Sequence, residues 1–168
     1  MLRSIRQWLD RHLWVLPILV FLIIETAFIA TRFLKNGAFL LAQLDTENRK
    51  EIYSSLTGSS SGLLGFALAA VAIMAAFGRR TASTPDQHNR ENRLAEARVG
   101  ISKILLATSV LLMVILVAST LAIGIDDSKT GSFTLTSIVT SAAISSVMGL
   151  LVSCAGLTLS LAERSQEP

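Results

Sequence analysis

The sequence predicts an all-α membrane protein with four transmembrane helices, on three observations. Of the 168 residues, 51% are hydrophobic and only 16% are charged, which is too apolar for a soluble domain of this size. Four long apolar runs reach the roughly 20 residues that a helix needs to cross a bilayer. No run alternates polar and apolar residues with a period of two, which argues against an outer-membrane barrel. The four predicted spans are 13–34, 56–77, 101–123 and 133–162.

The distribution of basic residues predicts the orientation. The N-terminal arm, the loop 78–100 with its edges, and the C-terminal tail hold ten of the 15 Lys and Arg residues, and the other two connections hold five. The positive-inside rule therefore predicts cytoplasmic termini and a cytoplasmic loop 78–100, with the chain in the inner (cytoplasmic) membrane. The net charge is only +3 and the basic residues lie at membrane edges, so we expect a lipid bilayer and no nucleic acid as partner.

The first span, 13–34, is rich in bulky apolar residues, as expected of a helix that faces lipid over much of its surface. Its exception is Glu25, the thirteenth residue of the span and therefore near the bilayer midplane. A carboxylate at that depth needs protonation, a hydrogen-bonding neighbour or lumen water. Two interpretations stay open: Glu25 lines a pore or senses protons, or it is a protonated side chain whose partners are hydroxyls of the last span.

The second span follows a predicted helix start at Asp45-Thr46, from which the helix runs without a break into 56–77. Its Gly58–Gly62 segment has the G-x-x-x-G spacing of close helix packing. As G-x-S-x-G it would be a hydrolase nucleophile elbow, but that motif needs a preceding strand and a histidine within reach. We therefore predict a packing face of small residues, comprising Gly58, Gly62, Gly65 and Ala69.

The third helix is predicted to begin in the cytoplasm. Thr84 and Pro85 are typical of an N-cap and a first helical residue, and no breaker follows before Gly100. The helix should continue to about Gly124, with roughly its first 15 residues protruding as a stalk of about 22 Å. Its arginines have two interpretations: a docking surface for a cytosolic partner, or a soluble helix end near anionic lipids. These residues are Arg90, Arg93 and Arg98.

The membrane part of this helix, 101–123, is the most uniformly apolar stretch of the chain, and we expect it to face lipid. Its isolated hydroxyls, Ser109, Ser119 and Thr120, can hydrogen-bond to the helix's own backbone.

The last span, 133–162, carries small or hydroxyl residues along one helical face. They are Thr134, Ser137, Ser141, Ser145, Gly149, Ser153, Gly156 and Ser160. Because hydrocarbon offers no hydrogen-bond partners, this face should be covered by other helices or by a water-filled lumen. We expect the small-residue face of the second span to be its partner. Ser141, Ser145 and Ser153 are thus candidates, with Glu25, for a pore or a buried polar path, and Gly149 and Gly156 for helix packing.

These observations favour a non-enzymatic membrane protein. No metal-ligand cluster, phosphate loop, catalytic dyad or cofactor fingerprint is present, and the lone Cys154 supplies neither a disulfide framework nor a Cys-rich metal site. We therefore expect no cofactor and no catalysis. A four-helix bundle fills its own core with side chains, so an aqueous pore would need several copies, most simply in a closed ring.

The first functional hypothesis is thus a homo-oligomer that forms or gates an ion or water pore. The alternative is a non-conducting scaffold or accessory subunit of a larger membrane complex. In its four spans and cytoplasmic termini the chain resembles the small four-span proteins of bacterial antiphage defence systems, such as the Kiwa transmembrane subunit. That resemblance implies a membrane effector or sensor with a cytosolic protein partner at the stalk, and it assigns no functional residue.

Overall fold

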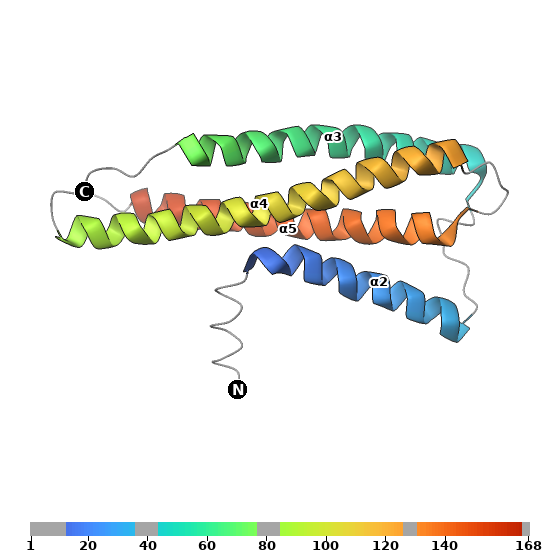
Figure 1. The fold of residues 1–168 in the computed structure, drawn as a ribbon, viewed down its shortest axis with the longest axis horizontal. Helices are drawn as coiled ribbons and strands as arrows, with labels where there is room; N and C mark the ends of the chain where they lie inside the picture. Colours follow the sequence, from blue (N-terminus) through green and yellow to red (C-terminus); the bar gives the residue numbers. More distant parts are fainter. Residues whose placement is uncertain (1–12, 36–43, 77–84, 126–130, 166–168) are drawn as a thin grey trace.

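The computed structural model describes residues 13–35, 44–76, 85–125 and 131–165, and all of its regular structure is helical (Figure 1). The elements are a short 3-10 turn η1 (Leu13–Val15) and the helices α2 (Leu16–Lys35), α3 (Thr46–Ala76), α4 (Pro85–Ile125) and α5 (Phe133–Ser165). All four α-helices are long and apolar enough to cross a membrane, which confirms the predicted four-helix class. The basic N-terminal arm and loop residues 78–84 lie outside the described residues.

The helix starts follow local rules. Asp45 precedes α3, and its backbone carbonyl accepts the N–H of Arg49 at 3.0 Å, the first bond of the helix. From there α3 runs unbroken into the predicted span. Pro85 is the first residue of α4, where its missing N–H costs nothing, and the helix continues to Ile125 in one piece. Both of these continuous helices were predicted.

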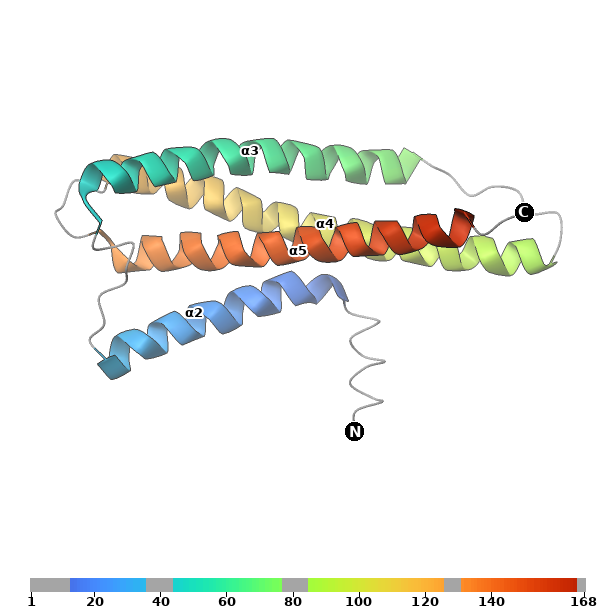
Figure 2. The same cartoon turned by 180° about the vertical axis from the view of Figure 1, so that it is seen from behind.

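The helices alternate in direction, so the start of α2 and the end of α5 lie at the same end of the molecule (Figures 1 and 2). Helix α4 packs along both α3 and α5, whereas α3 barely approaches α5, and α2 packs mainly against α5. In the membrane-length windows, 56% of α4 is buried but only 11% of α3 and 6% of α2. The expectation that α4 faces lipid is therefore wrong. An apolar sequence suits a helix packed inside the protein as well as one in contact with lipid, so the apolar character of α4 does not distinguish the two.

The apolar core consists of two clusters that both centre on α4. The larger one joins Tyr53 of α3, Leu112 and Ile115 of α4, and Val139 and Ala142 of α5. The smaller one joins Ala67 of α3 to Ile101 and Leu105 of α4. Without α4 the two outer helices would have little to pack against.

Hydroxyls on α4 were expected to bond to their own helix. Ser109 and Thr120 do so, donating to the carbonyls of Leu105 and Leu116 at 2.8 and 2.7 Å. Ser119 differs: its hydroxyl is buried with no hydrogen-bond partner among the described residues.

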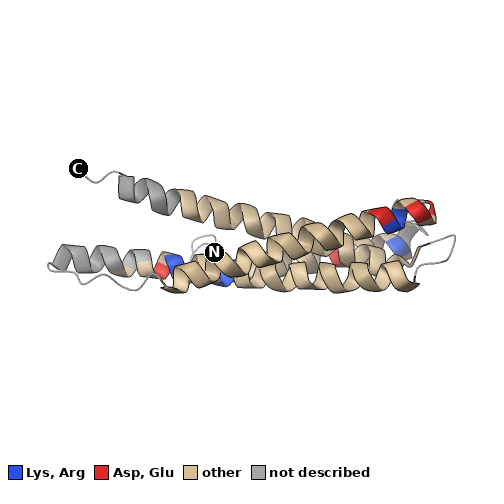
Figure 3. Cartoon of the chain, turned by 90° about the horizontal axis from the view of Figure 1, so that it is seen from above, with Lys and Arg blue, Asp and Glu red and all other residues tan. Residues whose placement is uncertain are grey.

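Charged residues gather at the two ends of the described helices, and the stretch between them is almost free of charge (Figure 3). This distribution fits helices whose middle parts lie in hydrocarbon.

Candidate functional site

The main polar site within the spans is a carboxyl group between α2 and α5. Glu25 lies halfway along α2 and is half-buried. Its Oε1 accepts the hydroxyl of Ser137 at 2.8 Å, and its Oε2 accepts the hydroxyl of Ser141 at 2.8 Å. The two serines are four residues apart and therefore stand one turn above each other on the same face of α5. Each carboxyl oxygen thus has its own hydroxyl partner.

Both serines also have a second acceptor. The Ser137 hydroxyl lies 3.1 Å from the Thr134 carbonyl, and the Ser141 hydroxyl lies 2.8 Å from the Ser137 carbonyl. A hydroxyl carries one proton and two lone pairs. Each serine can therefore donate to an ionised Glu25, and one of them can instead donate to its own helix and accept a hydrogen bond from the single O–H of the neutral acid. Rotation of the two serine hydroxyls therefore provides hydrogen bonds for the Glu25 carboxyl group whether it is ionised or neutral.

The rest of the α5 stripe, defined as Ser137, Ser141, Ser145, Gly149, Ser153 and Gly156, is also covered. Ser145 is fully buried and donates to the Ser141 carbonyl at 2.7 Å, and Ser153 donates to the Gly149 carbonyl at 2.9 Å. The prediction that this face is shielded is confirmed for its four buried serines, Ser137, Ser141, Ser145 and Ser153. It is wrong for Thr134, which belongs to the same predicted face and is exposed, and the side chain of Ser160 lies outside the described part of the chain. Neither Ser145 nor Ser153 contacts Glu25 in the hydrogen bonds of the structure, and both face protein.

The glycines of the stripe lie where side chains of neighbouring helices leave little room for a Cβ. A Cβ added at Gly149 would lie 2.2 Å from Oγ1 of Thr108 on α4 and 3.2 Å from Cγ of Pro17 on α2. At Gly156 it would lie 3.1 Å from Cγ1 of Ile101 on α4. The stripe therefore packs on α4 and α2.

The expected pairing of the stripe with α3 is wrong within one chain. The α3 face, defined as Gly58, Gly62, Gly65 and Ala69, is exposed, and a Cβ at any of its three glycines would meet nothing within 4 Å. The small-residue spacing indicates a surface that permits close approach, but α4 lies on a different side of α3. Packing of this face against another chain stays a prediction.

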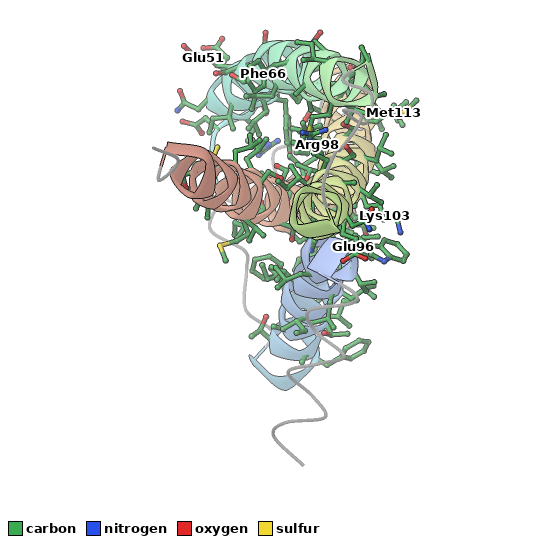
Figure 4. All side chains as sticks on the ribbon, turned by 90° about the vertical axis from the view of Figure 1, so that its left-hand side faces the viewer. Glu51, Phe66, Glu96, Arg98, Lys103 and Met113 are labelled. Atoms are coloured by element: carbon green, nitrogen blue, oxygen red, sulfur yellow. The ribbon has the colours of Figure 1, made fainter. Side chains whose placement is uncertain are left out.

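The stalk arginines separate into two groups. Arg98 is half-buried and lies among α3, α4 and α5 in the view along the helices (Figure 4). Docking of a cytosolic partner at the stalk stays a prediction. The side chains of Arg90 and Arg93 lie outside the described part of the chain.

A second polar cluster lies near the start of α3, and the sequence analysis missed it. Arg49 is fully buried; its guanidinium donates to the Leu44 carbonyl and to Thr46 Oγ1, the latter at 3.5 Å. The Arg49 side chain packs against Gly131, where an added Cβ would lie 3.0 Å from Nε of Arg49. Because Arg49 stands in a strongly polar stretch, the local sequence indicates a solvated side chain and carries no signal for burial.

One turn further along, Tyr53 joins α3 directly to α5. Its hydroxyl lies 3.0 Å from Thr136 Oγ1, and Thr136 in turn donates to the Ser132 carbonyl at 2.8 Å. Since Thr136 has a single proton, Tyr53 is the donor of this pair. A signal existed here, because this is the only tyrosine of the chain and a buried tyrosine needs a partner for its hydroxyl.

The fold and site define a helical protein with four helices of membrane-spanning length and one carboxyl group held by hydroxyls inside the spans. No protein-family model, curated protein or solved structure matches the chain.

Proposed function

We propose that this chain is one subunit of a homo-oligomeric membrane protein that forms or gates an ion or water pore, with Glu25 at the gate. The observation that carries the proposal is the Glu25 carboxyl in the middle of α2, whose hydrogen-bond partners among the described residues are two serine hydroxyls. Ionisable groups at such a depth are costly, and in membrane proteins they commonly mark ion or proton pathways.

Helix α2 is the element best suited to move. It is the least buried of the four helices, and it contacts the rest of the described chain mainly through α5. The contacts that hold it there include buried Pro17 near Gly149, Glu25 on the two serines, and the Arg32 guanidinium 4.6 Å from the ring centre of Phe133. Phe21 also packs against the larger core cluster. We propose that opening separates α2 from α5 at these contacts, because α2 has the smallest buried share of the four helices.

Such a movement would uncover polar groups. The serines that face Glu25 would then line, with the carboxyl, a path between neighbouring subunits. Rows of hydroxyls and carboxylates favour water and cations over anions. With α2 in place these groups are covered, so we assign the present arrangement to the closed state. The lumen must lie between protomers, because four helices fill their own centre.

The experiment is reconstitution of the purified protein in liposomes, with the fluxes of K⁺ and Cl⁻ measured separately. We expect a K⁺ flux that exceeds the Cl⁻ flux. Glu25→Gln should reduce that preference several-fold, and Glu51→Gln, which neutralises an exposed acid at the outer end of α3, should leave it unchanged. Absence of flux from a homo-oligomer, or an unchanged preference in Glu25→Gln, would contradict the proposal.

A second candidate function, a non-conducting scaffold or accessory subunit, is favoured by the open α3 face. Gly58, Gly62 and Gly65 leave the backbone of α3 accessible, which suits the close approach of another helix. Cross-linking of Gly62→Cys in a Cys154→Ser background, in membranes, separates the two candidates. Dimers of this chain would support the homo-oligomer, and a chain that never cross-links to itself there would support the scaffold.

The remaining expectations belong to the same proposal. The chain would lie in the inner membrane with both of its termini in the cytoplasm, and the first turns of α4 would form the stalk. By architectural resemblance alone, a pore of this kind would act as a membrane effector or sensor in antiphage defence, with a cytosolic protein as the stimulus.

A further inference from the structure

The position of Arg98 is the starting point for an inference that does not depend on conduction. Ile101 and Leu105 lie three and seven residues further along α4, so all three residues share one helical face. Both apolar residues are buried, at 6% and 3% exposure, in the cluster formed with α3. Arg98 therefore lies on the same face of α4 as these core residues, just before the apolar part of the helix begins.

The described neighbours of Arg98 do not neutralise it. No ion pair or hydrogen bond is recorded for its guanidinium among the described residues. Glu96 and Lys103 point to the opposite side of α4 (Figure 4). The other acids whose side chains the structure describes are Glu25 in the middle of α2 and three residues at the far end of α3, namely Asp45, Glu47 and Glu51. The side chains of Asp86, Glu91 and Glu163 lie outside that part of the structure.

The depth of Arg98 matches that of a lipid headgroup. The uncharged run of α4 begins at Ile104, six residues or about 9 Å along the helix. Headgroups occupy about 5 to 8 Å on each side of the hydrocarbon. The Cα of Arg98 therefore lies near the outer edge of the headgroup layer, where its guanidinium can meet a phosphate from the water side.

The apolar edges beside Arg98 are suited to an acyl chain. Because α3 barely approaches α5, the two helices do not close over α4. Val71 and Met74 of α3 and Leu150 of α5 border the smaller core cluster and remain only half-buried. A cation at headgroup depth next to half-covered apolar side chains has the complementary charge and shape for one phospholipid.

We propose that Arg98 binds the phosphate of an anionic phospholipid whose acyl chain lies along α4 between α3 and α5. The guanidinium can form two parallel hydrogen bonds to a phosphate, which an ammonium group cannot reproduce. The bound lipid would cover the apolar edges that the protein leaves half-exposed and would hold α3 and α5 at their separation.

The test uses the full chain purified in detergent, with phosphatidylglycerol or phosphatidylcholine added and retained lipid counted by native mass spectrometry. We expect wild type to retain phosphatidylglycerol in preference to phosphatidylcholine. Arg98→Gln should reduce that preference about fivefold, the effect of losing one basic contact worth about 1 kcal/mol. Lys103→Gln removes the same charge from the opposite side of α4 and should retain the preference.

Two further variants keep the result decisive. Arg98→Lys retains the charge, so it should fold and yet show a weaker preference than wild type. Glu163→Gln tests whether an acid in the last turns of α5 is the true partner of Arg98. If Arg98→Gln and Arg98→Lys both retain phosphatidylglycerol as wild type does, or if Glu163→Gln reproduces the loss seen in Arg98→Gln, the proposal is overturned.

Discussion

Two faces of this molecule have nearly the same sequence pattern and opposite surroundings. The α5 stripe and the α3 face both place small residues every three or four positions. The stripe packs on α4 and α2, and of the described glycines Gly149 leaves the least room for an added Cβ, whereas a Cβ at the glycines of the α3 face would meet nothing within 4 Å. The comparison shows that small-residue spacing defines a surface that permits close packing, and that the partner must come from elsewhere in the structure.

The largest expected effect comes from the covered face. Gly149→Ala places a methyl group against Thr108, whose own hydroxyl is held by the Ile104 carbonyl at 2.8 Å, and against Pro17. Overpacking of this kind costs about 1 to 3 kcal/mol, and we expect a value near the upper end because two neighbours must move. Thermal unfolding in detergent would measure the loss. The double variant Gly149→Ala with Thr108→Ala should recover a large part of it, and no recovery would place the strain elsewhere.

A smaller loss of stability is expected at Gly156, about two helical turns further along the same face. Gly156→Ala brings a methyl group 3.1 Å from Cγ1 of Ile101, and a shift of the isoleucine side chain by a few tenths of an ångström relieves the contact. The expected loss in the free energy of unfolding is about 1 kcal/mol or less. The same unfolding assay measures it. A loss larger than that of Gly149→Ala would reverse our ranking of the two helix contacts.

The smallest effect is expected on the open face. Gly62→Ala adds a methyl group to empty space and removes a flexible residue from a helix interior, so the stability of the single chain should stay equal or rise by up to about 1 kcal/mol. Gly62→Leu should also leave the unfolding of the single chain unchanged but weaken self-association measured by light scattering. A clear loss of single-chain stability in Gly62→Ala would show that α3 is covered within the chain after all.

Local features of the fold could be predicted from the sequence. The Asp45 helix start, the position of Pro85, the unbroken course of α3 and α4 and the backbone-bonded hydroxyls of Ser109 and Thr120 depend on residues within a few positions of each other. The candidate site was partly accessible in the same way. A carboxyl at mid-span requires a hydroxyl or water partner, and Ser137 and Ser141 were already known to share one helical face.

Other features could not be predicted because they depend on which segments meet. The local sequence predicts a solvated side chain for Arg49, which is fully buried. It predicts a stalk position for Arg98, which is half-buried and lies among the helices in the view of Figure 4. It predicts a hydrogen bond from Ser119 to its own helix, which the structure does not have. Nothing within a helical turn of these residues distinguishes the two outcomes.

The amino-acid sequence by itself determined that four apolar helices form, where they begin, and that the hydroxyl face of α5 has to be shielded from hydrocarbon. These properties follow from short-range backbone chemistry and from the cost of unpaired polar groups in an apolar medium. Only the tertiary structure decided that α4 is the central helix, that α2 supplies the carboxyl to α5, and that the α3 face stays open. Lipid and protein interior are equally apolar, so hydropathy does not distinguish them, and the choice depends on how the shapes of distant segments fit together.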